Sequence, residues 1–397
     1  MPPLRLLTFS TLYPHPGRPN HGVFVENRLR HLLASGEAVS TVIAPVPWFP
    51  SRHARFGDWA LHAEAPPVET RHGITVLHPR YPVLPRIGMA VTPYLLYRAM
   101  LPVMRKLLAE GQTFDLIDAH YVYPDGVAAV WLGRRFGLPV VVTARGTDVN
   151  LIPRYRIPRA LIRGVIRDAA ALVTVSAALK AALLALGAPD EAVTVLRNGV
   201  DTALFHPPAD RQALRRSLGL TRRTLISVGL LIDRKGHHRT IEAMAQLPDH
   251  DLLIVGEGPE RAALTDLIAR LGLGDRVRLL GARPHGELPG LYGAADASVL
   301  ASSREGWANV LLESMACGTP VVASNIWGNP EVVRVRAAGL IAPANTPDGI
   351  AATVRALFDP APDRAATRAY AEGFGWGETT SGQLALFRRV LAGRLGR

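Results

Sequence analysis

The sequence has little cysteine and no long hydrophobic run. One cysteine, Cys317, stands among 397 residues, so the chain cannot form an internal disulfide. No apolar stretch reaches the roughly 18 to 20 uncharged residues that cross a bilayer, and no secretory apolar core precedes Pro14. Glycines and prolines are scattered among apolar segments. These features exclude disulfide-scaffold, collagen-like and disordered classes, and we expect a cytoplasmic protein.

Lysine is almost absent from a strongly basic chain. Only three of the 45 basic side chains are lysines, and the formal net charge is +12. This excess favours anionic partners: nucleic acid, anionic lipid headgroups or phosphorylated small molecules. Lys235, directly before Gly236, stands out because arginine is used almost everywhere else. A compact ammonium suits a diphosphate as a point charge, and an ordinary surface lysine is the alternative.

Short apolar runs alternate with longer segments of helical periodicity. This order is typical of βαβ units and a mostly parallel sheet. Helical spacing predicts helices at 27–33 and 177–186, the second ending at Gly187. In the first half we expect buried strands at 4–9, 40–44, 116–118, 140–143 and 171–175.

A second series of strands follows a turn-rich segment around Asn198-Gly199 and Pro207-Pro208. We expect an N-terminal domain (1–204), a C-terminal domain (205–375) and a terminal helix (376–397) that packs back toward the N-terminal domain. The predicted fold class is α/β, with two Rossmann-like parallel-sheet domains. The strands expected in the second domain are 224–228, 252–255, 277–280, 297–300 and 320–323.

The segment 302–320 combines a loop, a helix and a helix stop. Good helix formers follow Asn309, so Glu305 should lie in the loop and Glu313 on the helix. Open α/β sheets bind ligands at the carboxyl ends of their strands, where helix N-termini attract phosphate. We expect Glu313 to accept two ribose hydroxyls and the backbone amides of Asn309 and Val310 to face a phosphate. Two solvated carboxylates on an exposed helix are the alternative.

Three residues of the first half are further candidates. His120 follows the apolar 116–119 run, so we expect it at the crevice, and a structural histidine is the alternative. Gly22 precedes a helical pattern, where a side chain would block phosphate, although glycines serve turns in many loops. Asp148 is an acidic candidate whose plain alternative is a helix N-cap.

Together these motifs resemble retaining glycosyltransferase family 4. The resemblance spans nearly the whole chain and implies the GT-B architecture, in which two Rossmann-like domains face a central cleft. It rests on Glu305 and Glu313 with seven residues between them, together with Gly22-Val23-Phe24-Val25-Glu26, His120 before Asp125-Gly126, Arg145-Gly146-Thr147-Asp148, Asn198-Gly199-Val200-Asp201, Lys235-Gly236 and Gly256-Glu257-Gly258-Pro259.

The resemblance implies roles for the donor-side residues. Glu305 would contact the hydroxyls of the donor sugar, and Glu313 the ribose. Lys235 and Gly22 would meet the donor diphosphate, and His120 would face the donor sugar at the reaction centre.

Two positions depart from the family pattern. Leu230 stands where the family usually has an arginine, and we expect Arg234 to supply that cation from a neighbouring position. Arg145 stands in place of a commoner histidine, and by resemblance it belongs with Asp148 to the acceptor side.

The implied activity is retaining, metal-independent transfer of a hexose from a nucleotide-diphosphate sugar to an acceptor hydroxyl. The nucleotide sugar is a co-substrate, and no cofactor is implied. A lipid-linked saccharide in exopolysaccharide or cell-envelope glycan synthesis is the expected acceptor. A sugar-nucleotide epimerase or hydrolase of the same fold, which needs no acceptor, is the alternative.

Five arginines between residues 154 and 167 are interleaved with apolar residues. The pattern predicts a basic amphipathic helix, which suits anionic headgroups at the inner face of the cytoplasmic membrane. A core-packed helix with a solvated arginine face is the alternative. A nucleic-acid-binding protein would also carry such charge, but the basic residues are dispersed along the sequence and aromatic residues make up only 6%, so we expect no nucleic-acid partner.

Overall fold

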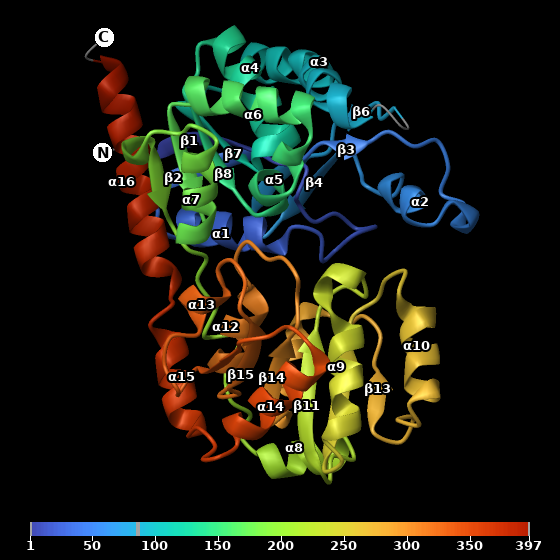
Figure 1. The fold of residues 1–397 in the computed structure, drawn as a ribbon. Helices are drawn as coiled ribbons and strands as arrows, with labels where there is room; N and C mark the ends of the chain where they lie inside the picture. The colour runs from blue at the N-terminus through green and yellow to red at the C-terminus, as the bar shows by residue number, and fades with distance from the viewer. Residues whose placement is uncertain (1, 85–87, 396–397) are drawn as a thin grey trace. The chain divides into compact units, whose positions relative to one another are not determined.

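The computed structural model describes residues 2–84 and 88–395, which form two compact units (Figure 1). Unit 1 joins the residues up to Arg197 to those from Gly377 onward, and unit 2 is Asn198–Trp376. The chain leaves unit 1 ahead of the Pro207-Pro208 pair near which we placed the boundary, and it returns to unit 1 through the last helix.

Within the described residues, unit 1 is built on an eight-stranded sheet of order β10-β9-β8-β7-β1-β2-β5-β4. Every neighbouring pair is parallel except β4 with β5. Val46–Pro47 (β3) and Arg80–Tyr81 (β6) form a separate small sheet. The large sheet consists of Leu4–Phe9 (β1), Ala38–Ile43 (β2), Val68–Arg71 (β4), Ile74–Leu77 (β5), Leu116–His120 (β7), Val140–Ala144 (β8), Ala171–Thr174 (β9) and Val193–Val195 (β10).

The β4–β5 hairpin is absent from our prediction. The side chains of β4 alternate between exposed and partly covered, because β4 is the edge strand of the sheet, whereas Ile74 and Val76 of β5 are buried. Four of the five strands that we predicted, β1, β7, β8 and β9, are buried over most of their length, as a parallel sheet covered on both faces requires, whereas β2 is buried only in part.

The strand order of unit 1 reverses between β1 and β7. From β1 the chain passes to β2 on one side and later to β7 on the other, so the loops after β1 and β7 diverge at the same edge. Such a point is the usual ligand position in an open parallel sheet. His120 is the last residue of β7 and lies there.

Helices cover the sheet of unit 1, and three of them, α3, α4 and α6, pack against one another (Figure 1). The expected helix over 154–167 begins later, since Arg154 lies in a separate 3-10 turn. The helices of this unit are Val23–Ala34 (α1), Asp58–His62 (α2), Gly88–Ala109 (α3), Val127–Phe136 (α4), Thr147–Asn150 (α5), Arg156–Asp168 (α6), Ala177–Ala185 (α7) and Trp376–Leu395 (α16).

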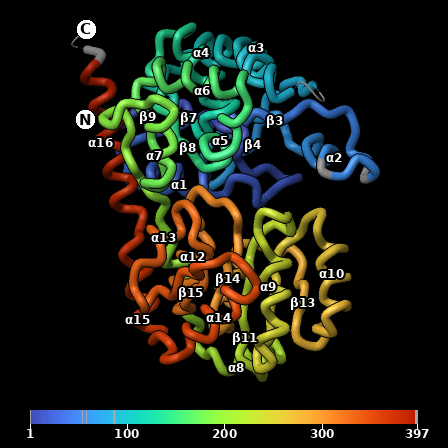
Figure 2. The backbone as a smooth tube through the Cα atoms, viewed as in Figure 1, coloured from blue at the N-terminus to red at the C-terminus, as the bar shows by residue number. Residues whose placement is uncertain are grey.

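The last helix, α16, belongs to the core of unit 1 from Gly377 onward (Figure 2). Leu384, Leu386 and Phe387 are buried in one apolar cluster with α1 and with Leu116 of β7. Side chains alternate along a strand, so Asp118 and His120 point to the same face as Leu116, toward α1 and α16.

Unit 2 holds a parallel sheet of order β13-β12-β11-β14-β15-β16 among the described residues. Its strand order reverses between β11 and β14, which are hydrogen-bonded neighbours. Residues of this sheet and the surrounding helices form one apolar core. The strands are Arg223–Val228 (β11), His250–Val255 (β12), Val277–Leu279 (β13), Ala297–Leu300 (β14), Val321–Ser324 (β15) and Gly339–Ala342 (β16).

The helices of unit 2 connect these strands on both sides of the strand-order reversal. They are Arg211–Ser217 (α8), His237–Ala243 (α9), Arg261–Arg270 (α10), Leu288–Ala294 (α11), Asn309–Ala316 (α12), Asn329–Val332 (α13), Pro347–Leu357 (α14) and Arg364–Glu372 (α15). The predicted α/β class with two Rossmann-like sheets is confirmed. None of the helices in the described ranges is long and apolar enough to cross a membrane.

The packing of α16 predicts a large cost for truncating its central aromatic residue. Phe387 is fully buried, so Phe387→Ala should lower the free energy of unfolding by about 3 to 5 kcal/mol, through lost transfer energy and the cavity left behind. Urea unfolding followed by circular dichroism measures this. Arg389→Ala, at an exposed position on the same helix, should change stability by less than about 0.5 kcal/mol. Equal losses in both variants would contradict the packing described.

Candidate active site

Lys235 and Glu305 meet at the carboxyl edge of the sheet in unit 2. Lys235 ends a 3-10 turn, Asp233–Lys235, in the loop after β11, and Glu305 lies in the loop after β14. Lys235 Nζ donates to Glu305 Oε1 at 2.7 Å, and Ser302 Oγ donates to the same oxygen at 2.7 Å. The strand-order reversal thus brings together two residues that are 70 positions apart.

Arg234 turns toward the same carboxylate. Its Nη1 lies 3.8 Å from Glu305 Oε2 and donates to the carbonyl oxygen of Arg304 at 3.1 Å. Glu305 is 7% exposed, and burial alone would raise the pKa of its carboxyl. Lys235, Ser302 and Arg234 outweigh burial and lower that pKa below its ordinary value. A carboxylate held as an anion between two cations is suited to accept hydrogen bonds from hydroxyl groups.

Leu230, at the position where we expected a cation to be missing, is 58% exposed. Arg234 Nη1, 3.8 Å from Glu305 Oε2, is a second positive charge near that carboxylate, and its role in replacing the missing cation stays a prediction.

The backbone at position 236, directly after Lys235, requires a glycine. Its φ is +70°, and a Cβ there would lie 2.0 Å from the carbonyl oxygen of Ala301. Glycine adopts this left-handed conformation without penalty and lets the loops after β11 and β14 touch through their backbones. Any other residue would push Lys235 away from Glu305.

Glu313 projects from α12, which begins at Asn309 as predicted. Its carboxylate lies 3.4 Å from the hydroxyl of Tyr292, which donates to it, and 3.5 Å from His285 Nε2. The hydrogen bond with Glu313 raises the pKa of His285, against the effect of burial. Sequence reasoning missed Tyr292 and His285, since neither stands in a recognisable motif.

The start of α12 has no side-chain cap. Asn309, its first residue, instead turns its side-chain oxygen toward Asn198 Nδ2 at 3.3 Å, and Val310 is partly covered. The helix start at Asn309 follows Glu305 by four residues, and Glu313 lies about one helical turn further on. One helix therefore carries both the amide donors and the acidic group that we expect to bind a nucleotide.

In unit 1, His120 is buried, with both ring nitrogens engaged. Arg145 Nη2 lies 2.7 Å from its Nδ1, and Asp118 Oδ2 lies 3.3 Å from its Nε2. Burial lowers the pKa of His120 to about 4, with Arg145 adding to the shift and Asp118 opposing it. The ring is therefore neutral at neutral pH. The sequence had suggested His120 and Arg145 separately, and the structure brings them into contact.

Asp148 is fully buried within α5, and the N-cap of that helix is Gly146. The backbone N–H groups of Val122, Arg145 and Gly146 donate to its carboxylate at 2.7 to 3.1 Å. Asp148 thus holds the loops after β7 and β8 in place and carries Arg145 toward His120.

Gly22 and Asp125 shape the loop after β1. Gly22 has φ +73°, and a Cβ there would lie 2.3 Å from the carbonyl of Leu12, so the loop itself requires glycine. The buried Asp125 carboxylate accepts hydrogen bonds from Thr11 N at 2.7 Å and Thr11 Oγ1 at 2.9 Å. Burial raises the pKa of Asp125 to about 7, although the bonds from Thr11 and Ser10 oppose this.

One Asp-x-Asp sequence, Asp249-His250-Asp251, lies away from these residues. It is at the amino end of β12, whereas Lys235 and Glu305 lie at the carboxyl ends of parallel strands. Asp251 Oδ1 is 3.6 Å from Arg222 Nη1. Its position does not suit a metal clamp for a ligand at Lys235.

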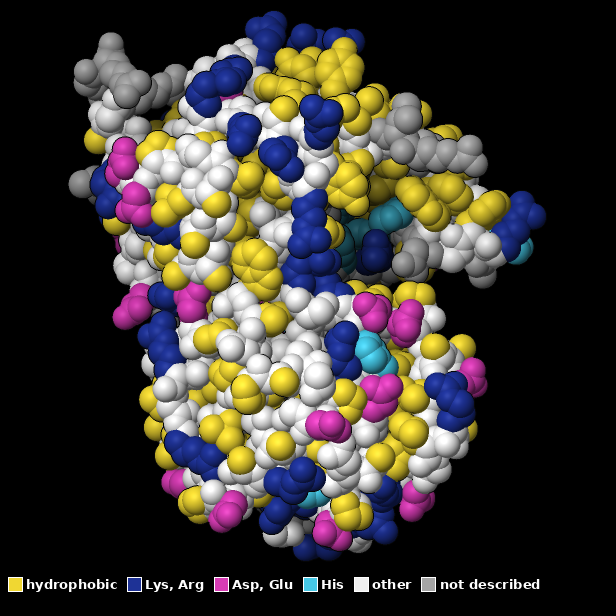
Figure 3. All heavy atoms as spheres, viewed as in Figure 1, with side chains coloured by type: hydrophobic (Ala, Val, Ile, Leu, Met, Phe, Trp, Pro, Cys, Tyr) yellow, Lys and Arg dark blue, Asp and Glu magenta, His cyan; other side chains and the backbone are white. Residues whose placement is uncertain are grey.

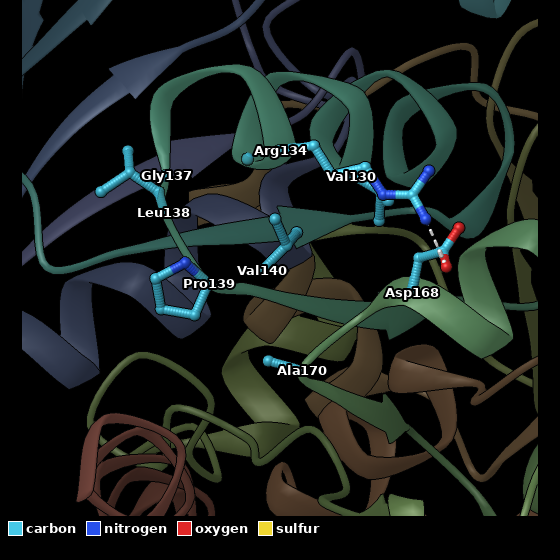
Figure 4. A pocket seen from close by; sticks show the side chains of 9 residues that line it. Val130, Arg134, Gly137, Leu138, Pro139, Val140, Asp168 and Ala170 are labelled. Carbon is cyan, nitrogen blue, oxygen red and sulfur yellow. Dashed lines mark ion pairs between the residues drawn. The ribbon is translucent and has the colours of Figure 1, made fainter. Parts of the chain in front are cut away.

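A pocket of about 280 Å³ lies in unit 1 between the end of α4, the start of β8 and the end of α6 (Figure 4). Apolar side chains line it, and Arg134 reaches across it to Asp168. None of the predicted site residues lines this pocket, so we assign it no part in the site described above.

Comparison with known proteins places this geometry in a family. Residues 21–204 match the family described as Glycosyltransferase Family 4, and residues 210–374 match Glycosyl transferases group 1. Over 312 residues the chain is 34% identical to D-inositol 3-phosphate glycosyltransferase 1 of Catenulispora acidiphila, covering 72% of this chain and 74% of that protein. The chain belongs to glycosyltransferase family 4. It is an enzyme that transfers sugar from a nucleotide sugar.

Further similarities in sequence and in structure support the assignment of this protein to glycosyltransferase family 4. A putative teichuronic acid biosynthesis glycosyltransferase, TuaC of Bacillus subtilis, is 29% identical over 82% of each chain. Sucrose-phosphate synthase from Thermosynechococcus elongatus has a TM-score of 0.81 at 21% identity, covering 98% of this chain and all of that one. Anabaena HepE in complex with UDP-glucose has a TM-score of 0.71 at 22% identity, covering 96% and 98%. The fold is GT-B.

The geometry of α12 in this glycosyltransferase predicts a specific defect for Glu313→Gln. In its expected role Glu313 is a charged acceptor of hydrogen bonds from the ribose hydroxyls, worth about 1.5 to 3 kcal/mol, so its replacement should lower donor affinity roughly tenfold to a hundredfold. Calorimetric titration with the nucleotide sugar measures this. Glu287→Gln, at a nearby exposed carboxylate, should leave affinity unchanged. Unchanged affinity in Glu313→Gln would reject the ribose role.

Proposed function

We propose that this enzyme transfers a hexose with retention of anomeric configuration and without a metal ion. The donor is a nucleotide-diphosphate sugar. The acceptor is the hydroxyl of a lipid-linked saccharide in exopolysaccharide or cell-envelope glycan synthesis. Transfer takes place in the cytoplasm, with the enzyme resting on the inner face of the membrane.

One observation carries the donor side of this proposal. Glu305 is buried as an anion against Lys235 Nζ at 2.7 Å, with Arg234 at 3.8 Å, at the strand-order reversal of unit 2. A sugar hydroxyl donates to the carboxylate, while the two cations remain available to phosphate oxygens beside it. Anion and cations together match a sugar joined to a diphosphate.

The chemical step is loss of a diphosphate leaving group. The bond between the anomeric carbon and the terminal phosphate oxygen breaks, and its electron pair stays on that oxygen. Lys235, Arg234 and the N-terminus of α12 stabilise the growing charge, which supports a reaction that uses no metal. The acceptor oxygen bonds to the anomeric carbon, and its proton passes to the departing phosphate oxygen, the base that the step itself generates.

In unit 1 the proposed contacts to the sugar and acceptor come from the end of β7 and the loop after β8. His120 and Arg145 lie there in contact, at the strand-order reversal. The His120 ring is neutral and its nitrogens are engaged. We therefore assign it a binding role rather than proton transfer. Arg145 is the cation that meets a polar or anionic acceptor.

Membrane association rests on the layer formed by α3, α4 and α6. Although basic residues are dispersed along the sequence, this layer, together with the turns that flank α3 and α6, gathers ten exposed ones against two acidic residues, Glu110 and Asp168. Figure 3 shows Lys and Arg side chains among hydrophobic ones over these helices. Tyr94, Tyr155 and Ile157 are at least half exposed between the charges. The ten residues are Arg98, Arg105, Lys106, Arg134, Arg135, Arg154, Arg156, Arg159, Arg163 and Arg167.

Such a layer suits an anionic lipid surface. Each basic residue near the surface contributes about 1 kcal/mol of attraction, and exposed tyrosines favour the headgroup region. The apolar side of α6 faces inward, with Ile162, Val165 and Ile166 buried, so the charged side is left for the membrane.

Product analysis tests the proposed reaction. Thermal-shift screening first finds the nucleotide sugar, since a bound donor raises the melting temperature. Labelled donor incubated with lipid-linked saccharides should then give a glycosylated product with the anomeric configuration of the donor, at a rate unchanged by a chelator. Donor consumption without any glycosylated acceptor would favour the epimerase or hydrolase. An inverted product, or a rate lost with the chelator, would contradict the mechanism.

Liposome flotation tests the proposed membrane surface. The protein should float with vesicles rich in phosphatidylglycerol and stay behind with neutral ones. Removing three charges of α6, as Arg156→Gln, Arg159→Gln and Arg163→Gln together, should weaken binding by about 3 kcal/mol, roughly a hundredfold.

The matched control removes three exposed charges of unit 2, at Arg261, Arg270 and Arg283. It should keep full flotation. Equal loss in both triple variants, or equal recovery on neutral and anionic vesicles, would reject the surface. Sub-micromolar binding to nucleic acid at physiological salt would reassign the layer to that partner.

A further inference from the structure

Gln383, a polar residue of α16, lies in the interior of unit 1. Gln383 is 2% exposed, and its neighbours Leu384, Leu386 and Phe387 are apolar and buried. Its Nε2 donates to Asp118 Oδ2 at 2.9 Å, and its Oε1 accepts from Arg28 Nε at 2.9 Å. A buried polar side chain is costly unless it is fully hydrogen-bonded, and Gln383 meets that condition through both ends of its amide.

The second partner of Asp118 Oδ2 is His120 Nε2, at 3.3 Å. On the other side of the imidazole, Arg145 Nη2 lies 2.7 Å from Nδ1. A guanidinium only donates, so Nδ1 accepts, and the single proton of the neutral ring sits on Nε2, pointing at Asp118. A continuous hydrogen-bonded chain therefore runs from Arg28 through Gln383, Asp118 and His120 to Arg145.

The amide is the group that this position requires. Arg28 is buried and donates, so it needs an acceptor, whereas Asp118 needs a donor. A side-chain amide offers an acceptor and a donor in one planar group. A glutamate would lose the donor and place two carboxylates together, and an apolar residue would leave Arg28 and Asp118 without these bonds.

Arg28 is itself held from a second direction. Its Nη1 donates to the carbonyl oxygen of Leu196 at 3.0 Å. Burial lowers the pKa of Arg28 to about 10, with Asp118 opposing the shift, so Arg28 remains charged at neutral pH. The Arg28 end of this hydrogen-bonded chain is thus anchored. Its other end is Arg145, the residue that we propose binds the acceptor.

We propose that Gln383 is a positioning residue for transfer, acting through Asp118 to fix the tautomer and orientation of His120 and, through it, the guanidinium of Arg145. The proposal rests on the proposed function for the importance of Arg145 to the acceptor. Gln383 itself touches no substrate. Its effect is to hold one arrangement of two side chains at the strand-order reversal of unit 1.

The experiment replaces Gln383 with methionine, which has a similar shape but neither bond, and compares it with Arg388→Gln. Arg388 lies on the same helix, and its ion pair with Glu37 is exposed and does not reach β7. Both variants weaken the attachment of α16, but only Gln383→Met breaks the series of hydrogen bonds that leads to His120. Urea unfolding of each variant reports the structural cost.

The first readout is the imidazole of His120 in protein labelled with 15N-histidine and assigned with His120→Gln. The wild type should show one tautomer, protonated at Nε2, that does not titrate between about pH 5.5 and 8. Gln383→Met should show a mixture of tautomers, and Arg388→Gln the wild-type spectrum. An unchanged His120 spectrum in folded Gln383→Met would overturn the proposal.

The second readout is kinetic. In Gln383→Met, kcat/KM for the acceptor should fall about tenfold to a hundredfold while the donor KM stays within about twofold. Arg388→Gln should keep wild-type kinetics. Activity losses that follow the loss of stability in both variants would show that Gln383 is merely structural and would also overturn the proposal.

A second variant guards against loss of folding. Gln383→Glu keeps the shape and the bond from Arg28 but, when ionised, cannot donate to Asp118, so at a pH at which the new carboxyl is ionised it should disturb His120 in the same direction. The spectroscopic readout needs neither donor nor acceptor. If the tautomer changes but the enzyme glycosylates no lipid-linked saccharide, the positioning role of Gln383 is upheld and the proposed acceptor is rejected. Failure of the positioning role and failure of the proposed function are therefore distinguishable.

Discussion

The ion pair of Lys235 and Glu305 is the interaction on which the proposed donor site depends. A carboxylate that is 7% exposed would be protonated or expelled if it stood alone, because burial disfavours its charge. Lys235, Ser302 and Arg234 reverse that preference. In the proposed donor site, the charge offered to a sugar is thus maintained by the same cations that are offered to phosphate.

Backbone packing makes the pair available. The loops after β11, β12 and β14 meet at one edge of the sheet, and they approach through glycines. Gly236 lies against Ala301, and Gly256, with φ +150°, lies so close to Gly229 that a Cβ would come within 1.8 Å of its carbonyl oxygen. The glycine motifs of this half therefore act first on the loops themselves. By allowing the loops to approach closely, they set the position of Lys235 relative to Glu305.

Unit 1 solves a different electrostatic problem. Two buried guanidiniums, Arg28 and Arg145, flank the buried carboxylate of Asp118, and a neutral histidine and an amide separate the charges. Buried charges persist only when they are paired and hydrogen-bonded. Here the pairing is indirect, through Gln383 and His120, so each of these groups has its orientation set by the next. The C-terminal helix is part of this arrangement and not only a cover for the apolar face.

The sequence by itself determined the α/β class, most buried strands, the start of α12 at Asn309 and the family. These properties depend on local periodicity, glycine positions and short motifs, which are written along the chain. It did not reveal the edge hairpin of β4 and β5, whose strands are only four residues long and of which β4 buries no side chain. Nor did it reveal the roles of Asp118, Tyr292 or Gln383, because none of them lies in a recognisable motif. Only the tertiary structure decided that Arg234 turns toward Glu305 and that the Asp148 carboxylate accepts hydrogen bonds from backbone amides. It also decided that Gln383, 265 residues from Asp118, donates a hydrogen bond to it. The physical reason is that the direction of a side chain, and the burial that gives a hydrogen bond its weight, are set by which strands and helices become neighbours in space.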